Sequence, residues 1–184
     1  MNNIIKRLCN TNELIELYSN FNDCDKFAVG YIDACTDNEC LIHSFQENDL
    51  DDGYYVMHND SVFEIRRRTK YLKNMLLFIK PNTEKYKLPK GYWTELDLFN
   101  VVLNLCKEER LMAMIRLDFG EECYGYINDF DDSILEIEMV DSDGIPDGIE
   151  YLRIEDVRVI GFGSLEANRR SKLFETQNNK QCKR

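Results

Sequence analysis

The sequence predicts a mainly β protein with short helices, an α+β fold built as a tandem repeat of two helix-plus-small-barrel units. Three observations favour this fold. The chain matches itself when it is shifted by 95 residues, short apolar runs with turn residues between them dominate each half, and a helical apolar pattern precedes each set of runs. The 184 residues leave each half a modest core.

The internal match is long enough to define the repeat. Residues 29–65 lie over residues 124–160 without a gap, and nine of the pairs are identical. The longest identical run joins Gly30–Ile32 to Gly125–Ile127. A second match, at an offset of 97, relates residues 3–9 to residues 100–106. We therefore expect one unit, a helix followed by strands, to be used twice.

The second copy predicts its elements more clearly than the first. Thr94 is expected to cap a helix that has Glu95 and Asp97 in its first turn and an apolar stripe ending at Cys106. Gly125 lies inside a predicted strand, which indicates a close backbone approach. Alternation and turn residues predict strands at 111–119, 123–130, 135–139, 149–154 and 157–162, and a first-copy strand at 13–18.

These patterns set the expected domain boundaries. Residues 1–80 are the first unit and residues 94–174 the second. Residues 81–93 hold two of the three prolines without periodicity and are expected to be a linker. Residues 175–184 are polar and are expected to be a flexible tail.

Part of the second copy resembles a known family. The pattern Leu-x-Phe-Gly-x-x-x-x-Gly-Tyr-Ile-x-x-Phe-Asp over residues 117–131 is similar to the first signature of the Sm-like (LSm) RNA-binding proteins. The resemblance implies an N-terminal helix and a five-stranded bent barrel of the SH3/Sm-like type. It departs from the family at two places. Leu135 stands near the expected asparagine, and residues 154–157 replace the basic second signature. The resemblance therefore supports the barrel more than an RNA pocket.

Composition bounds the class of protein. The net charge is −11, and residues 81–174 carry 20 acidic against 11 basic side chains, which opposes sequence-blind nucleic-acid binding. No apolar run is long enough for a membrane helix or a signal peptide, so we expect a cytoplasmic protein without membrane contact. Seven cysteines without a C-x-x-C pair are typical of reduced, packed thiols.

The candidate binding residues are basic clusters that follow the last strand of each unit, with an aromatic–acidic pair in the second unit. A basic stretch with an aromatic ring can grip phosphate and stack a base, but it is also typical of the wet face of a short helix, or of charge pairing with the acidic unit. The residues are Arg66, Arg67, Arg68, Lys70, Tyr71, Lys73, Phe130, Asp131, Arg169, Arg170 and Lys172.

Metal and catalytic sites find little support. Residues 141–148 superficially resemble a calcium loop but lack its full spacing, so turn chemistry is favoured. Cys35, Cys40 and His43 have no standard zinc spacing and no evident fourth ligand. Only His43 and His58 offer an imidazole base, and no phosphate cradle or nucleophile elbow is present. We expect no cofactor and no metal.

The sequence therefore favours a non-catalytic binding or regulatory protein, with a protein–protein adaptor or assembly module as the first hypothesis. RNA or single-stranded nucleic-acid binding through Sm-like barrels and basic tails is the second. An unrecognised hydrolase is the third. A protein partner is expected, RNA stays possible, and so does a homo-oligomer.

Overall fold

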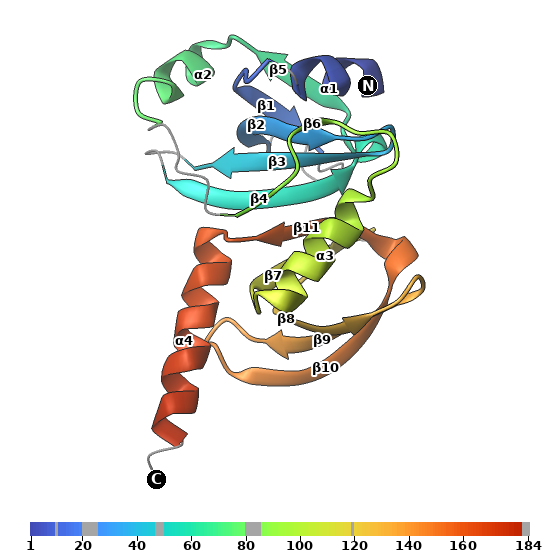
Figure 1. Ribbon diagram of the computed structural model, residues 1–184. Coiled ribbons are helices and arrows are strands. Elements are labelled where there is room, and N and C mark those ends of the chain that lie inside the picture. The colour runs from blue at the N-terminus through green and yellow to red at the C-terminus, as the bar shows by residue number, and fades with distance from the viewer. Residues whose placement is uncertain (10, 20–25, 47–49, 80–85, 119, 182–184) are drawn as a thin grey trace. The chain divides into compact units, whose positions relative to one another are not determined.

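The computed structural model describes all residues except 10, 20–25, 47–49, 80–85, 119 and 182–184, and the side chains of 178–181. It divides into two compact units, Met1–Leu98 and Phe99–Arg184 (Figure 1). Antiparallel strands dominate both units, and each unit also contains helices, so the α+β class that the sequence predicts is confirmed.

The first unit is a five-stranded antiparallel sheet with a helix before it and a helix after it. Its strands follow the order β4-β3-β2-β1-β5, and β6 pairs with β2 in parallel. The elements are α1 (Asn2–Cys9), β1 (Ile15–Tyr18), β2 (Ala28–Cys35), β3 (Glu39–Phe45), β4 (Asp51–His58), the 3₁₀ turn η1 (Asn59–Ser61), β5 (Glu64–Arg67), α2 (Lys70–Met75) and β6 (Gly91–Tyr92).

The second unit follows the same sequence of elements. Its strands have the order β10-β9-β8-β7-β11, which repeats the order of the first unit strand for strand. The elements are α3 (Leu98–Glu108), β7 (Met112–Leu117), β8 (Glu122–Phe130), β9 (Ile134–Val140), β10 (Pro146–Arg153), the 3₁₀ turn η2 (Ile154–Asp156), β11 (Val157–Phe162) and α4 (Leu165–Gln181).

The strand registers of the two sheets agree at the offset of 95 residues. Tyr31 pairs with His43 and His43 with Tyr54 in the first sheet, while Tyr126 pairs with Glu138 and Glu138 with Ile149 in the second. Both sheets also shift register at the same point, two residues after the glycine of the shared Gly-Tyr-Ile segment. A one-residue slip would expose the buried face of either sheet.

The two strand glycines explain part of this agreement. A Cβ on Gly30 would overlap the carbonyl oxygen of His43, and a Cβ on Gly125 would overlap that of Glu138. The close backbone approach predicted for Gly125 is therefore confirmed. Any larger residue would push the second and third strands of the unit apart.

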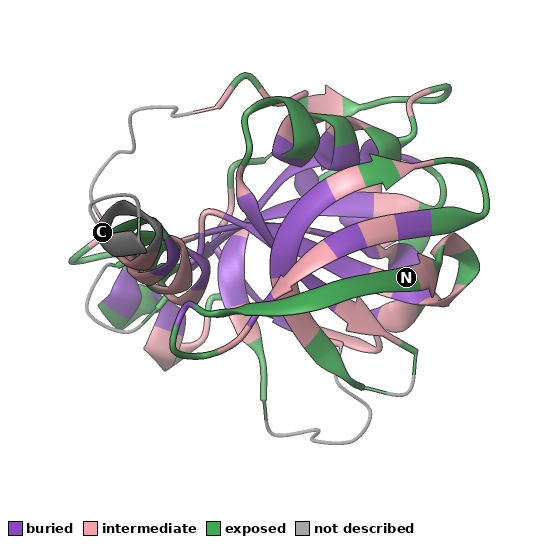
Figure 2. Ribbon diagram, turned by 90° about the horizontal axis from the view of Figure 1, so that it is seen from below, coloured by how far each residue is buried: buried purple, intermediate pink, exposed green. Residues whose placement is uncertain are grey.

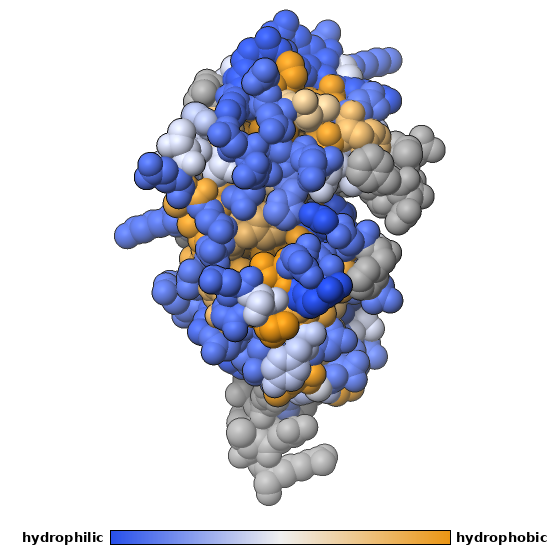
Figure 3. Space-filling model, turned by 90° about the vertical axis from the view of Figure 1, so that its right-hand side faces the viewer, coloured by the Kyte–Doolittle hydropathy of each residue, from blue (hydrophilic) through white to orange (hydrophobic). Residues whose placement is uncertain are grey.

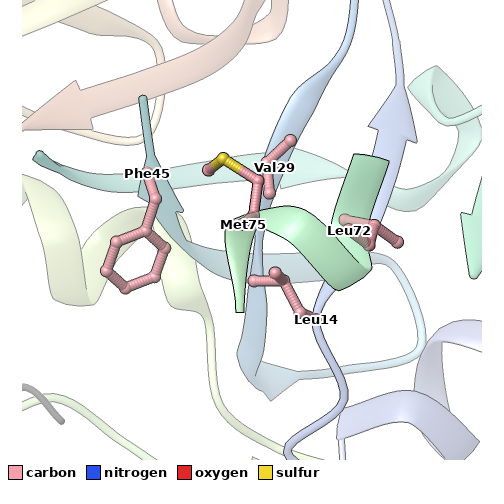
Figure 4. Packing of buried hydrophobic residues seen from close by; sticks show 5 residues of the cluster. All are labelled: Leu14, Val29, Phe45, Leu72 and Met75. Atoms are coloured by element: carbon pink, nitrogen blue, oxygen red, sulfur yellow. The ribbon is translucent and has the colours of Figure 1, made fainter. Parts of the chain in front are cut away.

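A helix packs on the outer face of each sheet and starts at an equivalent residue. The hydroxyl of Thr69 accepts the N–H of Leu72 at 3.2 Å, and that of Ser164 accepts the N–H of Ala167 at 3.1 Å. Leu72 and Met75 of α2 join a buried cluster with strand residues of the first unit, drawn in Figure 4. In the second unit, Ala167 and Phe174 of α4 make the corresponding cluster with Met112, Tyr126 and Val140.

Three elements differ from the sequence expectations. The helix predicted from Thr94 begins instead at Leu98, because the Glu39 carboxylate of β3 accepts the N–H of Leu98 at 2.7 Å and caps it from a distance. Gly91–Tyr92, in the stretch expected as a linker, forms β6. Helix α4 continues to Gln181, into the stretch expected as a flexible tail.

Candidate functional site

The arginines after the last strand of the first unit bind acidic residues of their own unit. Arg66 Nε lies 2.6 Å from Glu64 Oε1, and Arg68 Nε lies 3.0 Å from Glu13 Oε1. Arg67 also bonds Glu13, and this hydrogen bond is the main reason why the pKa of Glu13 lies below its ordinary value. Arg67 and Arg68 therefore fasten the end of β5 to the segment before β1, whereas Arg66 pairs within β5, and all three have a structural role.

The lysines of the predicted binding set are placed differently. Lys70 and Lys73 of α2 and Lys172 of α4 are exposed, and none has an ion pair with a residue in the described ranges. Tyr71 packs against the buried cluster of the first unit, with its ring 5.5 Å from that of Phe27 in an edge-on contact. The set thus contains three separate surface lysines and a half-buried tyrosine.

The arginines of α4 tie the helix to the end of β9. Arg169 and Arg170 both bind Glu166, at 2.8 and 2.7 Å, and they lower the pKa of Glu166 to about 2. Arg169 also donates to the carbonyl oxygen of Ser142 at 2.9 Å, and Arg170 to that of Val140 at 3.2 Å. Their hydrogen-bonding groups are therefore used inside the unit.

Phe130 and Asp131 lie at the opposite end of β9. The Asp131 carboxylate accepts the N–H groups of Ser133 and Ile134 at 2.7 and 2.8 Å, and these bonds lower its pKa. This is the geometry of a turn-forming aspartate. The seven residues of β9 hold this turn roughly 20 Å from the end that α4 contacts. The structure therefore separates Phe130 and Asp131 from Arg169 and Arg170.

The surroundings of the Asp131 turn are acidic. The N–H of Ile154 donates to the carbonyl oxygen of Ser133 at 2.9 Å, which places η2 beside the turn. Glu155 and Asp156 of η2 bind Arg153, the basic residue that precedes them. Lys107 lies over the Phe130 ring and binds Asp129 at 2.7 Å, so Arg153 and Lys107, the cations beside this turn, are both bound by carboxylates. Acidic groups outnumber basic ones there, which opposes phosphate binding.

The stretches considered for metals serve other purposes. Asp141 accepts the N–H groups of Asp143 and Ile145 at 2.9 and 2.8 Å, so it shapes the turn before β10. Cys35 and Cys40 are buried partners across β2 and β3, whereas His43 stacks on Tyr54 with ring centroids 4.4 Å apart. Within the part of the chain that the structure describes, no three His, Cys, Asp or Glu side chains cluster as ligands.

Strand β10 is an exposed edge strand, and the sequence patterns did not indicate it as a site. It ends the strand order of the second unit, and seven of its eight residues are exposed (Figure 2). Ile149 is 54% exposed and Tyr151 is 67% exposed. An exposed edge strand presents unpaired backbone N–H and C=O groups as a template for another strand.

Acidic side chains surround these apolar ones. Ile149 and Tyr151 pair in register with Glu138 and Glu136 of β9, and residues 134–153 carry six acidic side chains against one basic. Glu138 lies 3.3 Å from Arg110, whereas Glu150 has no ion pair with any described residue. Figure 3 shows hydrophobic residues of the second unit among hydrophilic ones on the molecular surface. We call the exposed strand and these neighbours the β10 edge: Glu136, Glu138 and residues 146–153.

Comparison with known proteins gives no relative from which a function can be carried over. None of the helices that the structure describes has both the length and the apolar character needed to cross a bilayer. No family model, no curated protein and no solved structure matches the chain.

Proposed function

We propose that the protein is a non-catalytic binding module for other proteins, and that it acts by adding an extended segment of a partner to the β10 edge. The observation that carries the proposal is the exposure of β10 along its length together with Ile149 and Tyr151. Strand addition uses backbone hydrogen bonds for affinity and side-chain contacts for specificity.

The energetics of such a contact are favourable. Burying an isoleucine side chain contributes about 1.5–3 kcal/mol, and each added backbone hydrogen bond contributes about 0.5–1.5 kcal/mol. A tyrosine offers a large, rigid surface at a low cost in side-chain entropy, which is why tyrosines are enriched at interfaces. Ile149 and Tyr151 therefore supply the apolar contact, and the strand supplies the pairing groups.

We also propose that the two units are copies of one small barrel of the SH3/Sm-like type, which makes the chain a tandem binding scaffold. The shared strand order, the shared register, the glycines Gly30 and Gly125 and the caps Thr69 and Ser164 support this proposal. A helix before five strands and a 3₁₀ turn before the fifth strand support it in both units.

The alternatives from sequence receive weaker support. RNA binding relied on the arginine clusters, and these arginines are engaged by Glu13, Glu64 and Glu166. A hydrolase relied on His43 or His58 as an imidazole base. His43 is buried against Tyr54, with Nε2 3.1 Å from Asp51. Ion pairs account for the arrangement of the arginines, and ring stacking accounts for that of His43.

Selection of peptides from a random displayed library on the full chain tests the proposal. Selected peptides are expected to bind the wild-type chain and to lose at least about tenfold in affinity for the Ile149→Ser/Tyr151→Ser double variant. Alternate N-methylation of a selected peptide is a second test. If strand pairing holds, methylation of one set of alternate amides abolishes binding and methylation of the other set preserves it.

The matched control is Leu77→Ser in the first unit, which removes an apolar side chain of comparable exposure. It is expected to leave peptide binding unchanged. Peptides that bind the double variant as well as the wild type, or a library that gives no binder at all, overturn the proposal.

A further inference from the structure

The first unit already holds an extended segment on its own sheet. Residues 86–93 run from β4, where the Tyr86 ring meets Tyr54 edge-on at 6.0 Å, to β6 beside β2 (Figure 1). The N–H of Trp93 donates to the carbonyl oxygen of Cys35 at 2.9 Å. The segment therefore combines an aromatic contact at one end with backbone pairing at the other.

Charge fixes the same segment in place. Lys90 binds Asp33, a carboxylate whose side chain is buried and which requires a cation there. The Tyr92 hydroxyl donates to Asp37 at 2.9 Å, and Lys6 binds both Asp37 and the Tyr92 hydroxyl. The bound segment is thus basic and aromatic, and the sheet that receives it supplies carboxylates and a ring.

The second unit keeps part of this receiving surface, although Asn128 stands in the place of Asp33. Ile149 stands in the register place of Tyr54, and Asp132 in the sequence place of Asp37. Tyr54 is 4% exposed, whereas Ile149 is more than half exposed. Among the described residues, the chain after Ser164 forms α4 as far as Gln181, whereas residues 86–93 of the first unit are extended.

We infer that the β10 edge of the second unit receives an extended partner segment rich in lysine or arginine and in aromatic residues. This is the chemistry of residues 86–93, which the first unit holds along β2. This inference rests on the proposed function and names the chemistry of its partner. The acidic excess of residues 134–153, in which Glu138 already binds Arg110, favours basic residues in the partner, and exposed Ile149 and Tyr151 favour apolar or aromatic ones.

The probe is a synthetic peptide with the sequence of residues 85–94, labelled with a fluorophore and added to the full chain. Binding is followed by fluorescence anisotropy. Two analogues accompany it, one with its three lysines replaced by glutamate and one with its tyrosines and tryptophan replaced by serine. We expect the parent peptide to bind, both analogues to bind at least about tenfold more weakly, and added salt to weaken the parent.

The variants locate the site. Ile149→Ser/Tyr151→Ser and Glu136→Gln/Glu138→Gln are each expected to weaken the parent peptide, while Leu77→Ser leaves its affinity unchanged. If the peptide displaced residues 86–93 from the first unit instead, the second-unit variants would bind it normally, and the inference would be wrong.

The outcomes separate this inference from the proposed function. Library peptides that depend on Tyr151 but carry no basic or aromatic bias would overturn the inference and leave the proposed function standing. Concentration-dependent dimers that Tyr151→Ser abolishes, with no binding of the probe, would identify a second copy as the occupant and would also overturn it.

Discussion

Tyr54 and Ile149 occupy the same register position of their sheets, opposite His43 and Glu138, yet Tyr54 is buried and Ile149 is exposed. The contacts of the two residues also differ. Tyr54 is stacked on His43 and covered by Tyr86, whereas Ile149 has a carboxylate neighbour. One strand position is therefore part of a packed face in the first unit and an open surface in the second.

The strand glycine of the second unit predicts a stability effect. Gly125→Ala places a Cβ against the carbonyl oxygen of Glu138, and we expect a loss of about 2–3 kcal/mol in the free energy of unfolding. The matched control is Gly148→Ala, where φ is +93° but no atom lies within 4 Å, with an expected loss of about 1 kcal/mol. Urea denaturation measures both, and equal losses would contradict the close approach.

The cap of α4 gives a second prediction. Ser164→Ala removes the hydroxyl that accepts the N–H of Ala167, and we expect a loss of about 1 kcal/mol in unfolding free energy. The matched control is Ser142→Ala. Ser142 is exposed and contacts Arg169 of α4 only through its carbonyl oxygen, so the substitution is expected to change the free energy of unfolding little. Thermal unfolding followed by circular dichroism compares the stabilities of the two variants. If Ser164→Ala is as stable as the wild type, the hydroxyl does not stabilise α4 as a cap.

Glu166 predicts a pH dependence. Arg169 and Arg170 lower its pKa to about 2 from an ordinary value of 4.5, so the stabilisation is complete above about pH 4.5 and is lost as the pH falls toward about 2. The carboxylate is more than a third exposed, so the effect is modest. Unfolding midpoints of wild type and Glu166→Gln are expected to differ above pH 5 and to converge near pH 2. A difference that stays constant with pH would refute the ion pair.

Two thiols of the second unit are expected to react slowly. Burial raises the pKa of Cys106 and of Cys123 to about 12, and the thiolate is the reactive species. Iodoacetamide at neutral pH should therefore label both far more slowly in the folded chain than in the denatured chain. Peptide mass spectrometry measures the rates at each cysteine. Equal rates for Cys106 before and after denaturation would contradict its burial.

The nucleic-acid alternative has its own test. The chain carries a net charge of −11, and the arginines of the basic clusters are engaged within their units. We expect a mixed RNA pool to show no binding even at low salt, as measured by filter retention. Salt-sensitive retention that Lys70→Ala/Lys73→Ala reduces would instead support a basic surface on α2.

The sequence predicted most strands because the alternation of apolar and polar residues is typical of a strand with one buried face. The strand expected at 157–162 is β11, and the one expected at 123–130 is β8 with a single residue added. The weakly supported first-copy strand at 13–18 is found as β1 from Ile15. Each of these depends on side chains that meet the core of their own unit.

The misplaced elements depend on distant contacts. Helix α3 starts at Leu98 because Glu39, far back in the chain, accepts its first N–H group. Helix α4 is mostly polar, and it is held through Ala167, Phe174 and the close approach of Gly144 to Leu173. The residues that surround each helix in the sequence therefore do not indicate where the helix begins or ends.

The candidate site was missed for a related reason. Residues Ile149, Glu150 and Tyr151 alternate as a half-buried strand does, and the acidic run around them is typical of a solvated surface. Whether that apolar row is covered depends on a segment elsewhere in the chain, as residues 86–93 show for Tyr54. The sequence also shows the arginines as basic clusters, but it does not show the acidic residues that bind them in the fold.

Hydrogen–deuterium exchange of the full chain, with and without a bound peptide, tests the central claim most directly. The account predicts new protection of the backbone amides of residues 146–153, while β2 and β6 of the first unit keep the exchange rates of the free protein. Protection confined to the first unit, or bound peptide with no change along β10, would contradict strand addition at this edge.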